Sequence, residues 1–186
     1  MGYKILYIFV EGNDDEKLFQ KILLSKLRKK NDDVKIIQYA QKPKKFKYIG
    51  KFVKSIQSMG ADYIYVTDIG NSQCVTAKKQ EVQNNLRNIE CDKIIVVIKE
   101  IESWYLAGLS DTECRSFQMR TFSVTDDITK EQFDTLRSNK FDSRIDFMSE
   151  ILKKFSIKIA KQKNKSIRYY IEKYNCESSV NINNKR

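Results

Sequence analysis

The sequence predicts an α/β fold with a central parallel sheet, helices on both faces and further helical segments at the C-terminal end. Two observations support this prediction. Runs of β-forming residues alternate with segments whose apolar residues recur at helical spacing. The runs are also nearly all apolar, as expected of strands buried on both faces. A length of 186 residues allows one domain with a helical appendage.

The first half of the predicted sheet lies before Gly60. Residues 3–10 form the first strand, and residues 14–29 form a helix with apolar residues at helical spacing. Residues 34–39 form the second strand. A second helix follows from Phe46 and ends near Gly60.

The second half repeats this order. Strands are expected over residues 62–67 and 93–98, with a helix over residues 76–89 between them. A short helix or turn follows over residues 101–109. We expect its Trp104 to pack against the sheet rather than stack on a base. The repeated strand–helix order predicts parallel strands joined by crossovers on both faces.

The pattern changes after Ser110. Residues 116–124 are expected to add one more strand, and three amphipathic helices should follow. Their expected ranges are Thr129–Ser138, Ser143–Phe155 and Ser166–Tyr174. Thr129 should cap the first of them, with Gln132 completing a capping box.

Three segments follow from this division. Residues 1–110 are expected to form the α/β core, residues 111–175 a mainly helical extension packed on it, and residues 176–186 a flexible tail. No run approaches the roughly 20 apolar residues of a membrane span, and we see no secretion signal. We therefore expect a cytoplasmic protein without a membrane partner.

The composition excludes several chemistries. The chain has no His, which removes Ser-His-Asp and Cys-His catalysis. Its four Cys are scattered without a C-x-x-C pair, so a zinc site is not expected. Acid–base work would fall to Asp, Glu, Lys, Tyr or water on a metal.

The net charge of +11 is concentrated in two stretches. Six Lys and no acid lie between Lys42 and Lys54, and the segment from residue 151 onward carries ten Lys or Arg against two Glu. Such patches attract phosphate backbones, although a Lys-rich surface typical of a low-GC genome is the alternative. The candidate nucleic-acid-binding residues are Lys42, Lys44, Lys45, Lys47, Lys51, Lys161, Lys163, Lys165 and Arg168.

Acidic residues follow three of the predicted strands. The stretch from Glu11 to Glu16 follows the first strand, Asp68 ends the third, and Glu100 and Glu102 follow the fourth. Carboxylates at the carboxyl ends of parallel strands converge on one edge of a sheet, where they suit a hard divalent cation. Helix-start acids, a turn cap and solvated loop acids remain the structural alternatives.

These residues resemble a known family. An apolar strand ending in Glu11-Gly12, and another ending in Asp68, are similar to the Toprim domain of topoisomerases, DnaG-type primases and OLD-family nucleases. The stretch from Ile98 to Ala107 resembles the Glu-Ile-Glu-x-Trp-Leu-Leu-Ala signature of small stand-alone DUF4276-like proteins. The resemblance covers roughly residues 3–110 and implies a Toprim-like, Rossmann-like sheet.

The resemblance also implies roles by position. Glu11 matches the Toprim glutamate, and Asp68 matches the first acid of the Asp-x-Asp motif. The second Asp is replaced here by Gly70, which puts catalytic competence in doubt. The implied catalytic residues are Glu11, Asp68, Glu100 and Lys99. The implied metal ligands are Glu11, Asp15, Asp68, Glu100 and Glu102.

The resulting hypothesis is a nuclease or phosphodiesterase that uses Mg²⁺ or Mn²⁺ and acts on nucleic acid, with DNA favoured over RNA. The alternative is a non-catalytic Toprim-like subunit of a defence-type system that binds nucleic acid or an ATPase partner. A homodimer also remains open. A nucleotide-binding domain is disfavoured, because no Gly-rich phosphate loop follows the first strand.

Overall fold

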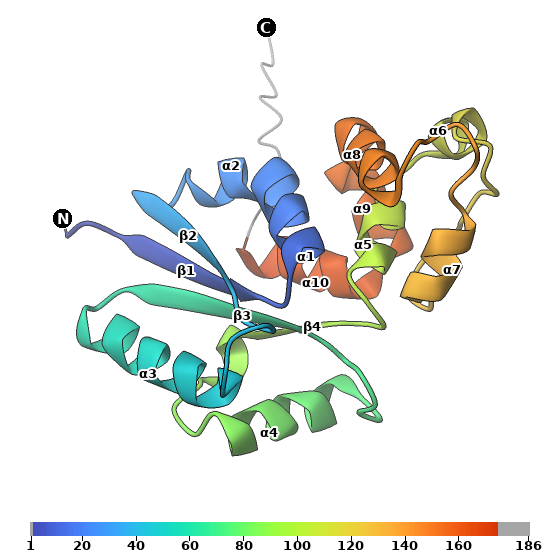
Figure 1. Ribbon diagram of the computed structural model, residues 1–186. Helices are drawn as coiled ribbons and strands as arrows, with labels where there is room; N and C mark the ends of the chain where they lie inside the picture. The colour runs from blue at the N-terminus through green and yellow to red at the C-terminus, as the bar shows by residue number, and fades with distance from the viewer. Residues whose placement is uncertain (1, 175–186) are drawn as a thin grey trace, which may run out of the picture.

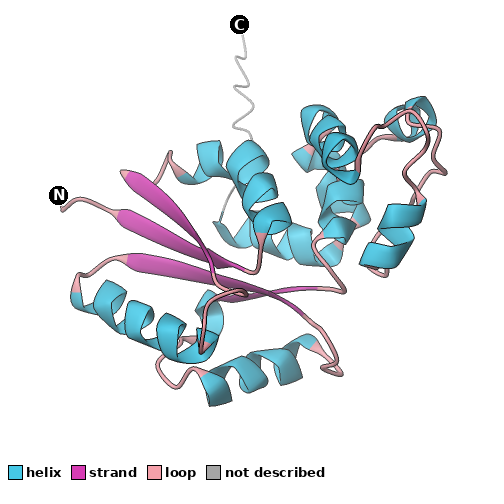
Figure 2. Ribbon diagram, viewed as in Figure 1, coloured by secondary structure: helices cyan, strands magenta, loops and turns pink. Residues whose placement is uncertain are grey.

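A four-stranded parallel sheet forms the centre of the protein in a computed structural model that describes residues 2–174. Helices cover both faces of the sheet, which confirms the predicted α/β fold (Figures 1 and 2). The strand order is β2-β1-β3-β4, and every neighbouring pair is parallel. The strands are β1 (Ile5–Val10), β2 (Asp33–Gln38), β3 (Asp62–Asp68) and β4 (Ile94–Val97).

Alternating side chains of each strand enter two separate apolar clusters. In β1, Leu6, Ile8 and Val10 join one cluster, whereas Tyr7 and Phe9 join the other. This two-sided burial explains why the strands are nearly continuous apolar runs. The apolar pattern of the strands therefore correctly predicted that both faces of the sheet are covered.

Each face is covered by its own set of helices. One face carries α1 (Asn13–Leu18), the π-helical turn η1 (Phe19–Leu23) and α2 (Leu24–Leu27). The opposite face, below the sheet in Figure 1, carries α3 (Lys45–Ser58) and α4 (Val75–Asn85). The π-helical turn interrupts the single helix predicted over residues 14–29. A short 3₁₀ helix, η2 (Cys91–Lys93), leads into β4.

All described regular elements after β4 are helices. Thr129 accepts a hydrogen bond from the Gln132 N–H, which confirms the predicted capping box. The last helix packs on the α1 side of the sheet, next to β4. The helices are α5 (Glu102–Ala107), α6 (Asp111–Ser116), α7 (Lys130–Thr135), α8 (Arg144–Lys154), α9 (Ile157–Lys163) and α10 (Lys165–Tyr174).

The strand predicted over residues 116–124 is wrong. After α6 the chain forms a loop in which Gln118 has a left-handed φ of 60°. Phe117, Met119 and Phe122 are buried in the apolar cluster of the helices, so their near-alternation reflects insertion into a core rather than a pleated strand. The sequence prediction also missed α9.

A continuous apolar core joins the sheet to the C-terminal helices. Trp104 is fully buried, contacts the Phe19 and Tyr170 rings, and donates a hydrogen bond of 2.7 Å from Nε1 to Ser166 Oγ. This burial confirms the expected packing role of Trp104. The tail expected over residues 176–186 lies outside the described residues. No described helix combines the length and apolar character needed to cross a bilayer.

Candidate functional site

The topology places a switch point at the carboxyl ends of β1 and β3, where the chain connections run in opposite directions. The connection through α1 places β2 on one side of β1, and the connection through α3 places β3 on the other side. Open α/β sheets bind ligands at such a switch point. Glu11 directly follows β1 and Asp68 ends β3. The backbone N–H of Asp68 lies 3.3 Å from Glu11 Oε1, so the structure brings these two predicted site residues together.

Hydrogen bonds fix one oxygen of Glu11. Its Oε1 accepts from the Thr67 hydroxyl at 2.9 Å and from the Asp68 N–H. The Tyr39 hydroxyl, which also donates to the Val66 carbonyl at 2.9 Å, lies 3.2 Å from the same oxygen. Among the described residues, Oε2 of Glu11 has no hydrogen-bond donor. Burial, followed by the nearby Tyr65 and Glu11, raises the pKa of Tyr39 well above its usual value, so its hydroxyl remains a donor.

Sequence reasoning missed Tyr39 and Thr67. Both are buried and lie at the carboxyl ends of strands, Tyr39 directly after β2 and Thr67 within β3. The sequence did contain a signal for both residues: a hydroxyl at the carboxyl end of an apolar strand. A buried hydroxyl requires a hydrogen-bond partner, so such a residue indicates a polar neighbour.

Asp68 is a strongly perturbed carboxyl group of the site. Its Oδ1 is buried and has no hydrogen-bond partner within the described part of the chain. Burial, then the charges of Glu11, Asp15 and other acids, raises the pKa of Asp68 to about 9. An unsatisfied buried carboxyl group is costly. Buried titratable groups with strongly shifted pKa values are characteristic of functional sites.

Asp15 lies in the first turn of α1, where its charge interacts with that of Glu11. The residue is buried, and its Oδ2 accepts a hydrogen bond of 3.2 Å from the Gly12 N–H. Burial, then the Glu11 charge, raises the pKa of Asp15 to about 7. Asp15 thus has a local structural role at the start of α1 as well as a position near Glu11.

Glu100 and Glu102 follow the fourth strand, as predicted, but do not lie in an extended segment. The strand ends at Val97, Lys99 is exposed with a left-handed φ of 60°, and Glu102 begins α5. Glu100 accepts a hydrogen bond from the Lys130 N–H at the start of α7. Both charges nevertheless contribute to raising the pKa of Asp68, after burial and the charges of Glu11 and Asp15.

Gly70 occupies the position where the Asp-x-Asp motif would have its second acid. Its φ of 56° is left-handed, a conformation that a side chain disfavours. A Cβ atom at this position would lie 3.8 Å from Lys78 Nζ. The backbone conformation of the turn after β3 therefore favours glycine at position 70.

The predicted basic stretch that starts at Lys42 begins at the same carboxyl edge of the sheet as Glu11. The backbone N–H of Tyr39 bonds the Val10 carbonyl at 3.0 Å, and the N–H of Ala40 bonds the Glu11 carbonyl at 3.1 Å. The chain then continues into the exposed lysines of the loop and of α3. These five residues, here called the basic loop, are Lys42, Lys44, Lys45, Lys47 and Lys51.

The second basic group is divided. Lys165 and Arg168 are exposed, and Lys165 borders a groove of about 510 Å³ between α4, β4 and α10, together with Lys79 and Tyr169. Lys161 instead pairs with Glu172 at 3.4 Å. Lys163 donates to the Leu109 carbonyl at 2.8 Å, which ties α9 to the end of α5.

No protein-family model, curated protein or solved structure matches this chain. Within residues 2–174, no three Asp, Glu or Cys side chains form a group already arranged to hold a metal ion. Glu11 accepts a hydrogen bond from the Asp68 backbone N–H, and the charges of Glu11 and Asp15 both raise the pKa of Asp68.

Proposed function

We propose that this protein is a Mg²⁺- or Mn²⁺-dependent phosphodiesterase of the Toprim type that acts on nucleic acid. The observation that carries the proposal is the pairing of Glu11 with Asp68 at the switch point, where Asp68 Oδ1 is buried without a hydrogen-bond partner among the described residues. A divalent cation would satisfy this oxygen and neutralise the adjoining charges, so the residues fit the group.

Glu11, Asp68 and Asp15 would hold the cation. When bound, it would supply Lewis-acid activation of the phosphodiester and offset the charge that develops on its oxygens. The protein's own contribution is positioning. Tyr39 and Thr67 fix Oε1 of Glu11, which leaves Oε2 to face the ligand. The basic loop starts from the Glu11 carbonyl and would guide a phosphate backbone to the same edge.

The first prediction concerns Glu11. Purified protein should nick supercoiled plasmid or degrade single-stranded DNA with Mg²⁺ or Mn²⁺, and EDTA should stop the reaction. Glu11→Gln keeps the side-chain shape but removes the charge, so cleavage should fall by at least about 100-fold. The matched control is Glu90→Gln, because Glu90 is an exposed acid before η2. Equal cleavage by wild type and Glu11→Gln would refute the site.

The second candidate function is a non-catalytic binding subunit. The glycine-specific turn at Gly70 favours it, because the second acid of the motif is absent and its backbone conformation disfavours a replacement. Isothermal titration calorimetry with Mg²⁺ and Mn²⁺ separates the two functions. Binding of neither cation at millimolar concentration, together with retained DNA binding, would support the binding subunit.

The second prediction concerns the basic loop. Changing Lys42, Lys44 and Lys45 to Gln should weaken DNA binding and reduce the slope of log K against log salt by about 2–3, since each lost phosphate contact removes about 0.7–0.9. Fluorescence anisotropy over a salt series measures this slope. A control with the same charge change replaces exposed Lys4, Arg28 and Lys29 at the opposite, amino end of the strands. An identical effect of both triple variants would indicate non-directional charge attraction.

A further inference from the structure

The groove between α4, β4 and α10 combines an apolar lining with an exposed aromatic ring. Its volume is about 510 Å³, and Val75, Val96 and Ile98 supply apolar side chains to its lining. Tyr169 of α10 also lines the groove and is 47% exposed. A space of this size suits a flat group of the size of one nucleotide and is too small for a duplex.

The charge around this ring is positive. Lys79 and Lys165 line the groove, and no Asp or Glu does so among residues 2–174. Lys173, one turn along α10 from Tyr169, adds a third ammonium group. The Nζ atoms of Lys79 and Lys173 lie 5.7 Å and 5.6 Å from the centre of the Tyr169 ring. An aromatic ring next to several cations is the combination that binds a base together with its neighbouring phosphates.

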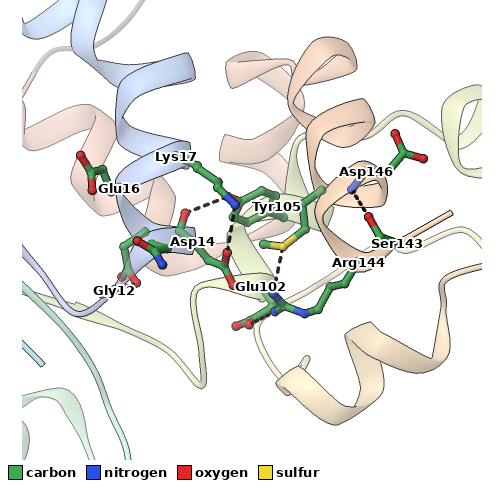
Figure 3. A network of polar contacts seen from close by, with 12 residues as sticks. Gly12, Asp14, Glu16, Lys17, Glu102, Tyr105, Ser143, Arg144 and Asp146 are labelled. Atoms are coloured by element: carbon green, nitrogen blue, oxygen red, sulfur yellow. Dashed lines mark hydrogen bonds and ion pairs between the residues drawn. The ribbon is translucent and has the colours of Figure 1, made fainter. Parts of the chain in front are cut away.

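The cations near the proposed site differ in whether they are free to bind a phosphate. The Lys165 side chain is 77% exposed, and its contact with Asp126 is 3.9 Å long, so this ion pair contributes little. Arg144 of α8, in contrast, pairs with Glu102 at 2.6 Å and also with Asp14 (Figure 3). Positive charge for a phosphate is therefore available at the groove rather than at Arg144.

The groove lies one strand away from Asp68. Asp68 of β3 is paired in register with Val97 of β4, and neighbouring strands are about 4.8 Å apart. Ile98, the next residue, lines the groove. A chain whose phosphodiester reaches Asp68 could therefore continue over the carboxyl end of β4 into the groove.

An added β-strand fits this groove less well, although β4 is an edge of the described sheet. The Ile98 N–H donates to the Ser166 hydroxyl at 3.2 Å. Just before β4, the Cys91 and Asp92 carbonyls accept hydrogen bonds from lysine side chains. Backbone groups at both ends of the strand are thus already bonded, which disfavours strand addition. The positive lining also favours an anion over an uncharged peptide backbone.

We propose that the groove holds one unpaired nucleotide of a single-stranded nucleic acid, with its base on Tyr169 and the adjoining phosphates at Lys79 and Lys165. This inference rests on the proposed function, since the bound strand is the substrate that also reaches Glu11 and Asp68. It makes single-stranded nucleic acid the preferred substrate class.

The first experiment measures binding by fluorescence anisotropy in EDTA, where cation-dependent cleavage does not occur. A thymidine oligomer of about 12 nucleotides is compared with an abasic oligomer of the same length. Wild type should bind the thymidine oligomer about 5- to 100-fold more tightly, the usual contribution of a stacked base. Tyr169→Ala should bind both oligomers alike, whereas Tyr169→Phe keeps the ring and should keep the preference.

Controls separate stacking from a change in the fold. Tyr3→Ala removes another exposed tyrosine and should bind as wild type does. Binding of a duplex should not change in Tyr169→Ala, because its bases are already paired and stacked. Tyr169→Leu, which keeps an apolar side chain without a ring, tests the same point if Tyr169→Ala does not fold.

The second experiment removes the positive charge. Replacing Lys79 and Lys165 with Gln should weaken binding of both oligomers and lower the slope of log K against log salt by about 1–1.5, since each contact with a single strand contributes about 0.7. The control replaces exposed Lys4 and Lys29, at the amino end of the strands, with Gln. An equal effect of the two double variants would overturn the phosphate contacts.

The outcomes separate this inference from the proposed function. Equal affinity of wild type for the two oligomers, or an unchanged preference in Tyr169→Ala, would overturn the inference even if the protein cleaves DNA with Mg²⁺. Tighter binding of thymidine monophosphate than of the oligomer would also overturn it, since the ligand would then be a free nucleotide. Loss of the preference in Tyr169→Ala, in a protein that binds no divalent cation, would support the inference and overturn the proposed cation site.

Discussion

Replacing Asp68 with Asn should abolish cation-dependent cleavage and, without divalent cations, make the folded protein more stable at about pH 8. Cleavage is expected to fall by at least about 100-fold, because a neutral amide binds a hard cation weakly. Stability should rise because Asn keeps the shape of the side chain but requires no buried charge. A residue that lowers stability and is needed for activity is characteristic of a functional site.

The direction of the change in stability follows from the raised pKa of Asp68. An unfolded Asp titrates near 4, whereas burial and the charge of Glu11 raise the pKa of folded Asp68 to about 9. The folded state therefore holds its proton at pH values where the unfolded state has lost it. The free energy of unfolding of the wild type should decrease as pH rises from about 4 toward 9. Asp15 adds a decrease between about 4 and 7.

Urea denaturation in EDTA measures this effect. Asp68→Asn should gain roughly 2–4 kcal/mol over wild type at about pH 8 and little at about pH 4. Added Mn²⁺ should stabilise wild type but not the variant. Asp127→Asn, a substitution at an exposed acid, is the control and should leave the free energy of unfolding unchanged at both pH values. A loss of stability in Asp68→Asn at about pH 8 would contradict the assignment of a raised pKa.

Trp104→Ala should cost about 3–5 kcal/mol of unfolding free energy, the usual range for a fully buried aromatic residue. The substitution removes ring contacts with Phe19 and Tyr170 and leaves the Ser166 hydroxyl without the indole donor. Because these partners come from η1 and α10, the loss should affect the sheet and the C-terminal helices together.

Far-UV circular dichroism in urea measures this loss. Tyr3→Ala is the control, since Tyr3 is 72% exposed and its removal should change the free energy of unfolding by less than about 0.5 kcal/mol. Trp104 is the only Trp in the chain, so its fluorescence in the wild type reports on the junction of core and extension. Its transition should coincide with that of circular dichroism if the two parts unfold together. A separate, earlier loss of helix would show that the C-terminal helices unfold on their own.

Local patterns were sufficient for most of the fold. Each strand of the sheet is a run of apolar residues, and each crossover helix shows a helical period, so both could be identified within a few residues. The same local logic failed over residues 116–124. There, the spacing of the apolar residues Phe117, Met119 and Phe122 suggested a strand. These residues are instead buried in the core from a loop, and no strand of the described sheet pairs with them.

That acids follow strands β1, β3 and β4 could be predicted from the chain alone, because local composition marks the end of each strand. Which of these acids meet depends on how the strands and helices pack. Glu11 meets the Asp68 backbone N–H because β1 and β3 are neighbours, whereas Glu100 bonds the start of α7 and Glu102 pairs with Arg144. These contacts join residues far apart in the chain. Their partners are set by packing and by the need of each buried charge for a counter-charge, which no local pattern records.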